Sequence, residues 1–338
     1  MNHVEHIVKN KRHLELRAQV IRLIREFFWS QDFLEMETPL LLQLPGQEPH
    51  LNPMRVSLHN ERGEEFVGYL HTSPEYTLKK MLAAGFEKIF YVCKVFRDRE
   101  SFGGTHNPEF TMIEWYRGNA DMFAIMDDCE LLIPYIQEQL QKHANYEKYE
   151  ITKYEKFERL HMREAWQNYA GVNLDEHLER EKIFELCVKK GYTPNPREPY
   201  EDLFYRIFLN EIEPHLGKER PTIVHHYPKP MAALCKMSET DPNYAERFEL
   251  YIDGLELANA FGELTDKKEQ LRRLEADQAQ RQALGKEVFD IDKEFVEAVG
   301  QMPPSGGIAL GIDRLVQLFT GCQNIDDVLS LPASKLFL

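Results

Sequence analysis

The sequence predicts an α+β fold in which a mostly antiparallel sheet is flanked by helices. Apolar residues recur at helical spacing over residues 16–28, which indicates a long amphipathic helix near the start of the chain. β-rich runs then come in adjacent pairs, as in RFELYIDGLELANAF at residues 247–261, where an Asp-Gly pair forms the turn. The helical segments are grouped between such pairs, and this order favours an antiparallel sheet.

The first helix should begin by about residue 14 and stop at residues 30–32, where its apolar spacing ends. The extended segment FLEMETPLL, residues 33–41, follows this helix. Its proline, Pro39, has no amide hydrogen to give to a sheet ladder, so we expect the segment at a sheet edge or at an interface.

Residues 59–85 predict a hairpin that leads into a helix. Ser73 is the expected N-cap of that helix, Pro74 fits its first turn, and Gly85 ends it. The next apolar run, KIFYVCKVF at residues 88–96, predicts a buried strand. This part of the chain therefore alternates between a hairpin, a short helix and a strand of the main sheet.

The second half of the chain begins with a helical pattern at residues 122–140, and further helices are expected through residues 155–215. We interpret residues 120–215, roughly, as a helical insertion in a single catalytic domain that spans residues 1–338. Beyond it, the pattern predicts a strand at residues 222–228, a charged, solvated helix at 266–284, and a glycine-rich strand running into a last helix at 306–321.

The composition is that of a globular, acidic protein. Of the 338 residues, 43% are hydrophobic, and 41 Lys and Arg face 56 Asp and Glu, so that the net charge is −15. Such a chain is repelled by nucleic acid unless its basic residues gather on one face. The alternative interpretation is that the acidity serves solubility alone.

The cysteines and the apolar runs indicate the cellular compartment of the protein. Its five cysteines are scattered without a C-x-x-C pair, which favours free thiols in a reducing compartment. The first residues are charged throughout and do not resemble a signal peptide. No apolar run reaches the ~18 residues that span a bilayer. We therefore expect a cytoplasmic protein that does not bind membranes.

The segment FRDRESFGGTHNPEFTMIEWYR, residues 96–117, carries the strongest signal for a binding site. Its second part alternates as a strand, and this puts Glu114 on one face between aromatic side chains. A carboxylate in that position needs a cationic partner if it is buried. Arg97 and Phe110 would suit an anion and a planar ligand, and the alternative is a structural salt bridge between Arg97 and Glu114.

Five segments, in order, resemble the class II aminoacyl-tRNA synthetases, specifically the lysyl branch. FLEMETPLL resembles motif 1, a dimer-interface element, and residues 96–117 resemble motif 2. GGIALGIDRLVQL resembles motif 3. HTSPEYTLKKML resembles the amino-acid loop, and GLELANAFGELTD the segment for magnesium, ATP and amino acid. The resemblance spans nearly the whole chain and implies a class II synthetase-like catalytic domain that forms a homodimer.

The resemblance implies that an amino-acid carboxylate attacks the α-phosphorus of ATP to give an aminoacyl adenylate. Arg97 and Arg314 would be the catalytic residues, the first bridging the α-phosphate and the carboxylate. Phe110 and Arg314 would enclose adenine, while Glu256 and Glu263 would bind Mg²⁺; the alternative for these two is that they are solvent-exposed hairpin carboxylates. The implied ATP-binding residues are Arg97, Asp98, Arg99, Glu100, His106, Asn107, Phe110, Glu256, Leu257, Gly311 and Arg314.

The same resemblance implies an acidic pocket for the amino acid. Several carboxylates in one cleft would select a dicationic ligand such as a lysine. Ala309 stands where lysyl-tRNA synthetases typically have glycine. Its β-carbon would crowd an α-amino group and favour a substrate whose amino group is attached one carbon along the chain. The alternative is a neutral change at a packing position. The implied substrate-binding residues are Ser73, Pro74, Glu75, Glu114, Tyr116, Asn259, Glu263 and Ala309.

The chain is more similar to truncated paralogues than to lysyl-tRNA synthetases themselves. The motif 1 helix begins too early to leave room for an anticodon-binding OB-fold domain. The chain resembles the group that ligates (R)-β-lysine to a lysine of bacterial elongation factor P, with ATP and Mg²⁺ as cofactors and no tRNA. The alternatives are a minimal enzyme that charges tRNA or a tRNA-like RNA, and a non-catalytic sensor of lysine or an adenylate.

Overall fold

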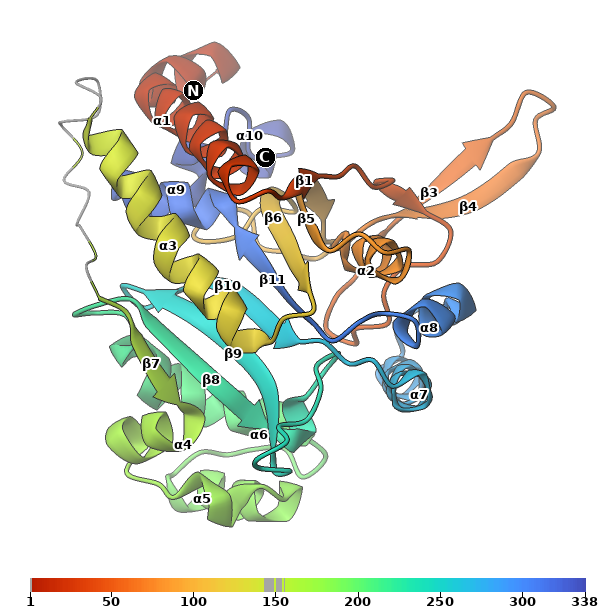
Figure 1. The fold of residues 1–338 in the computed structure, drawn as a ribbon, viewed down its shortest axis with the longest axis vertical. Coiled ribbons are helices and arrows are strands. Elements are labelled where there is room, and N and C mark those ends of the chain that lie inside the picture. Colours follow the sequence, from red (N-terminus) through yellow and green to blue (C-terminus); the bar gives the residue numbers. More distant parts are fainter. Residues whose placement is uncertain (1, 143–148, 150–153, 155) are drawn as a thin grey trace.

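A computed structural model describes residues 2–142, 149, 154 and 156–338, and its centre is an eight-stranded sheet (Figure 1). The strand order is β1-β5-β6-β11-β10-β9-β8-β7. Only the two outer pairings, β1–β5 and β7–β8, are parallel, so the prediction of a mostly antiparallel sheet is confirmed. The strands are β1 (Leu34–Glu35), β5 (Lys88–Phe96), β6 (Glu109–Gly118), β7 (Glu158–His161), β8 (Thr222–Pro228), β9 (Tyr244–Ile252), β10 (Leu255–Gly262) and β11 (Ser305–Gly311).

Three helices cover one face of this sheet and form the main hydrophobic core with it (Figure 1). They are α1 (His3–Ser30), α3 (Met122–Gln141) and α9 (Ile312–Thr320). Helix α1 stops where predicted but starts at His3, because Asn2 and Glu5 form a capping box there. None of the helices in the described part of the chain is long and apolar enough to cross a membrane.

A small second sheet of order β2-β4-β3 projects from the body of the protein (Figure 1). It consists of β2 (Leu41–Leu42), β3 (Met54–His59) and β4 (Glu65–Leu70), so the predicted hairpin is present. Helix α2 (Glu75–Ala83) follows, and Pro74 takes the position before it. The Ser73 hydroxyl still accepts a hydrogen bond from the Glu75 amide at 3.0 Å, as an N-cap side chain does.

The stretch predicted as a helical insertion contains two kinds of helix. Helix α3 packs in the main core, whereas residues after it form a second core against β8 and β9. Trp166, Phe204 and Phe208 lie at the centre of this second core. Its regular helices are α4 (Met162–Ala165), α5 (Arg180–Lys189) and α6 (Tyr200–Ile207).

The remaining helices lie near the end of the chain and include the charged segment predicted as solvated. That segment is α7 (Lys267–Ala283), and it is followed by α8 (Lys293–Val299) and α10 (Ala333–Leu336). One face of α7 is not solvated, since Gln270, Leu274 and Arg281 are buried. Arg281 is buried because its guanidinium donates to the carbonyl oxygens of Glu48 and Leu51, at 2.9 and 3.0 Å.

Asp313 joins three elements of the main core. Its carboxylate accepts from the Thr111 amide of β6 at 3.1 Å and pairs with Arg17 of α1, while its own backbone belongs to α9. The side chain is 2% exposed. Removing one partner from a buried ion pair leaves an uncompensated charge, so this link should be sensitive to substitution.

We predict that Asp313→Ala lowers the free energy of unfolding by about 3–5 kcal/mol, because it leaves the Arg17 guanidinium buried without its anion. Urea denaturation measures the change. Asp327→Ala is the matched control: it removes a solvated partner of Lys9 on the same helix and should cost at most about 1 kcal/mol. Equal losses in both variants would contradict the assignment.

Candidate active site

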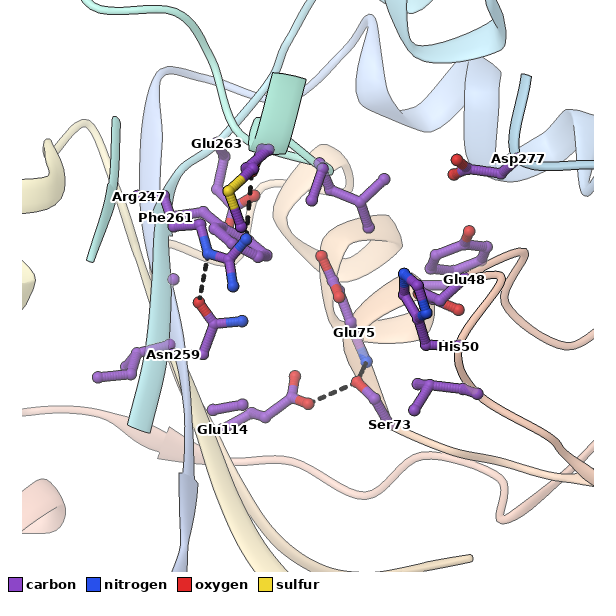
Figure 2. A pocket seen from close by; sticks show the side chains of 18 of the residues that line it. Glu48, His50, Ser73, Glu75, Glu114, Arg247, Asn259, Phe261, Glu263 and Asp277 are labelled. Carbon is purple, nitrogen blue, oxygen red and sulfur yellow. Dashed lines mark hydrogen bonds between the residues drawn. The ribbon is translucent and has the colours of Figure 1, made fainter. Parts of the chain in front are cut away.

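A cavity of about 320 Å³ lies where β6, β10 and β11 meet α2, and Figure 2 shows its lining. The strand register sets its floor, since Ala309 of β11 pairs with Glu114 of β6 on one side and with Asn259 of β10 on the other. Of the predicted substrate residues, all but Pro74 line this cavity: Ser73, Glu75, Glu114, Tyr116, Asn259, Glu263 and Ala309.

Glu114 is the carboxylate that the alternating strand placed between aromatic residues, and it is 1% exposed. It accepts hydrogen bonds from the Ser73 hydroxyl at 2.5 Å and from the Tyr116 hydroxyl at 2.9 Å. Burial, with a further contribution from Glu75, raises the pKa of Glu114 to about 8. No ion pair joins Arg97 to Glu114, so the alternative of a structural salt bridge between them is wrong.

A single buried ammonium group links two further carboxylates of the cavity. Lys79 lies one helical turn after Glu75 on α2, and its Nζ is 2.5 Å from Glu75 and 2.6 Å from Glu263. Burial opposes its charge, but these two carboxylates outweigh burial and raise the pKa of Lys79. Lys79 pairs with two of the carboxylates, whereas Glu114 is bound only by hydroxyl groups. When all three carboxylates are ionised, this group of four side chains has two negative charges in excess, which a dicationic ligand would neutralise.

Lys79 and Arg247 also belong to the site and were not predicted from the sequence, although both lie close to predicted residues. Lys79 is four residues after Glu75, a spacing that brings side chains together on a helix. Arg247 pairs with Glu249 two residues along the same strand at 2.6 Å, a spacing that puts both side chains on one face, whereas its cavity-side partners come from other segments. It donates to the Asn259 Oδ1 at 3.2 Å, which leaves the Asn259 amide nitrogen for the cavity (Figure 2), and to the Tyr205 hydroxyl at 3.1 Å.

The predicted phosphate side of the site gathers around Arg97, which also lines the cavity. Its guanidinium lies 5.0 Å from the centre of the Phe110 ring. The resemblance implied that adenine lies between the Phe110 ring and Arg314. In the structure the Arg97 guanidinium lies over the ring, and Arg314 donates a hydrogen bond to the Glu256 carbonyl at 2.8 Å. The Arg97 Nε is buried without a hydrogen-bond partner, so this group is open to an anionic ligand.

The structure does not bring the predicted magnesium pair together. Glu256 lies near the start of β10 and Glu263 directly follows its end. Because a strand rises about 3.3 Å per residue, their Cα atoms are roughly 20 Å apart. Magnesium–oxygen bonds are about 2.1 Å long, and one ion cannot reach both. Glu263 instead pairs with Lys79.

The carboxylate that neighbours Glu256 is Glu249, from the adjacent strand β9. Burial and then the charge of Glu249 raise the pKa of Glu256, whereas Arg314 opposes this shift. Within the described residues, no group of three or more acidic, histidine or cysteine side chains could hold a metal ion alone. A magnesium ion that phosphates also ligate needs only one or two carboxylates, and Glu256 fits that requirement, whereas the buried Glu249 carboxylate is already bound by Arg247 and the Tyr251 hydroxyl.

Several other predicted ATP residues have partners within the protein. The Asn107 side chain is buried and bonds to the Glu109 carbonyl at 2.6 Å and the Ala333 amide at 2.9 Å. The Leu257 side chain lies in the main core, so only its backbone can face a ligand. Glu100 pairs with His106 at 3.1 Å, and Gly311 caps α9. Asp98 and Arg99 are exposed and lie beside a separate cavity next to the C-terminal helix.

Comparisons with known proteins show the family to which the chain belongs. The family model for class II tRNA synthetases (D, K and N) matches residues 6–335. Proteins named elongation factor P–(R)-beta-lysine ligase are similar throughout. The one from Haemophilus influenzae is 38% identical over 99% of both chains, and the one from Proteus mirabilis is 36% identical over 94% of both. The chain belongs to this ligase family, within the class II tRNA synthetases. The predicted fold class and family are thus confirmed.

We predict that lysine binds more tightly as the pH rises from 6 to 8. Below its raised pKa Glu114 is mostly protonated, and a bound ammonium favours the ionised form, so binding should release a proton. The affinity should then rise by up to about tenfold per pH unit. Titration calorimetry in buffers of different ionisation enthalpy measures both effects. Glu114→Gln should flatten the profile, and a flat profile in the wild type would contradict the role of Glu114.

We predict that Gly307→Ala blocks this pocket. A β-carbon at Gly307 would collide with the Tyr116 ring and the Glu263 carboxylate. Overpacking of this kind costs about 1–3 kcal/mol, so lysine should bind about 10- to 100-fold more weakly. The matched control is Gly118→Ala on neighbouring β6, whose β-carbon would make ordinary contacts from 3.4 Å outward. Unchanged lysine binding by Gly307→Ala would place the ligand elsewhere.

Proposed function

We propose that this protein activates (R)-β-lysine with ATP and transfers the β-lysyl group to a lysine side chain of elongation factor P. The observation that carries the proposal is a buried pocket with two uncompensated negative charges, open to Arg97 at one side. The names of the similar proteins support this choice of amino acid and acceptor. ATP use is supported by the synthetase family to which the chain belongs.

In the first step, the pocket residues hold the amino acid by its two ammonium groups. The carboxylates of Glu114, Glu75 and Glu263 accept hydrogen bonds from these groups. The Asn259 amide nitrogen donates to an acceptor atom of the ligand. Arg97 orients the substrate carboxylate toward the α-phosphate and neutralises charge as it develops there. Arg314 and Phe110 bind the nucleotide.

Magnesium would belong to the nucleotide side of the site. Glu256, whose side chain is 39% exposed, would hold the ion, which when bound supplies positive charge to the phosphates. Glu263, in this proposal, serves the amino acid instead. Its partner Lys79 fixes the position of its carboxylate.

We further propose a homodimer in the cytoplasm that acts without tRNA. The dimer would form through the end of α1 and the start of β1, where Trp29 and Leu34 are 53% and 56% exposed. An acceptor that is a translation factor places the reaction in the cytoplasm. The net charge of −15 opposes binding of tRNA.

We predict that the label of radioactive (R)-β-lysine enters elongation factor P and not tRNA. Purified protein, ATP and the amino acid are incubated with either acceptor, and pyrophosphate exchange is measured in parallel. Arg314→Ala should lose both activities, because the nucleotide loses a cationic contact. Label in tRNA alone would indicate a minimal tRNA-charging enzyme. Pyrophosphate exchange with neither β-lysine nor α-lysine would indicate a sensor.

A further inference from the structure

The cavity continues beyond the amino-acid pocket into an outer chamber that the first reaction step does not use. Its lining includes Glu48, His50, Glu201 and Asp277, and Figure 2 shows three of these on the side of Glu75 away from Asn259. They come from three parts of the chain: Glu48 and His50 from the loop before β3, Glu201 from helix α6 of the second core, and Asp277 from helix α7. Arg97 lines the same cavity, so the outer chamber and the phosphate side are continuous.

The loop that carries Glu48 is held rigidly over this chamber. Arg281 of α7 donates to the carbonyls of Glu48 and Leu51, and Lys286 donates to the Pro49 carbonyl at 2.6 Å. These bonds use backbone oxygens, so the position of the loop does not depend on the Glu48 carboxylate. Its Oε2 is buried against Gly46 without a hydrogen-bond partner.

A second unpartnered group lines the cavity beside Glu48. The Tyr76 side chain is 9% exposed, and its hydroxyl is buried with no hydrogen-bond partner. Buried polar groups are normally satisfied, so an unpartnered hydroxyl and an unpartnered carboxylate oxygen in one cavity indicate a missing polar ligand. The surrounding carboxylates make that ligand a cation, and a long side chain with a terminal ammonium would fit a chamber that opens to solvent.

At the outer edge, one ion pair fixes the opening of the chamber. His50 Nε2 lies 2.8 Å from the Glu201 carboxylate, and the His50 side chain is 49% exposed. This pair joins the loop of Glu48 to α6, so the second core forms one wall of the opening. A lysine side chain of a protein acceptor would pass between this wall and Asp277 on α7.

We propose that Glu48 is the catalytic base of the transfer step and that the outer chamber is the channel for the acceptor lysine. This inference rests on the proposed function. The acceptor ammonium gives one proton to the Glu48 carboxylate, and its nitrogen lone pair then forms a C–N bond to the adenylate carbonyl carbon. The C–O bond to AMP breaks with its electron pair on oxygen, and the second nitrogen proton passes to that phosphate oxygen.

The protonation of Glu48 suits this role near neutral pH. Burial, with Glu75 and Asp277 adding to it, raises the pKa of Glu48 to about 7, and burial raises that of Asp277 to about 6. A base with a pKa near the working pH is the most effective. The titratable and charged groups around Glu48 are Glu75 and Tyr76 of α2, Arg97 after β5, Asp277 and Arg281 of α7, and the His50–Glu201 pair.

The test separates the two half-reactions. Enzyme-bound β-lysyl adenylate is isolated and mixed with elongation factor P, and single-turnover transfer is compared with pyrophosphate exchange. Glu48→Gln should slow transfer about 100-fold, at least tenfold more than it slows exchange. Wild-type transfer should accelerate as the pH rises through about 7, where Glu48 ionises, and then level off. The variant should show no such plateau, because its rate follows the neutral fraction of the acceptor amine, which keeps rising. Glu48→Asp should recover part of the transfer rate.

Two controls distinguish a base from a structural residue. Hydroxylamine attacks the adenylate as a neutral molecule, so Glu48→Gln should slow its reaction far less than it slows transfer to elongation factor P. Glu275→Gln makes the same charge change on an exposed position of α7 and should leave both steps unchanged. Equal losses in transfer and exchange, or a plateau retained above pH 7 in Glu48→Gln, would overturn the inference. Absent exchange in the wild type would overturn the proposed function itself.

Discussion

The buried ion pairs of Lys79 hold the amino-acid pocket together. Carboxylates of α2 and of the end of β10 would repel one another if they faced the same cavity without a cation, and Lys79 lies 2.5 and 2.6 Å from the two. Because this one ammonium cannot also neutralise Glu114, the pocket keeps its negative excess. The same interaction therefore stabilises α2 against the sheet and leaves the charge that a dicationic ligand requires.

The second core, after α3, acts on the site through two contacts and not only as packing. Tyr205 of α6 accepts from Arg247, which in turn orients Asn259 at the pocket floor. Glu201, one turn earlier on α6, pairs with His50 at the opening of the outer chamber. Helix α6 thus connects the inner and outer ends of one cavity, and its apolar face is fixed by packing around Phe204.

Much of the fold could be predicted from the sequence because its signals are local. The Asp253-Gly254 turn, with φ of 54° and 74°, and the strands on either side of it follow from residues adjacent in the chain. Amphipathic spacing likewise predicted α1 and α9, although not the capping box that extends α1 to His3. The membership of the family could also be predicted, since its motifs are short and ordered.

The sequence by itself determined which residue types enter the site, such as Arg97, Glu114 and Glu263. Only the tertiary structure decided their partners. Glu263 pairs with Lys79 of α2, and the register of β9 and β10 puts Tyr251 opposite Glu256 and Glu249 opposite Asn259. Residue spacing along a chain does not give the distance between side chains once strands are extended and elements cross over, whereas electrostatic interactions depend on that distance.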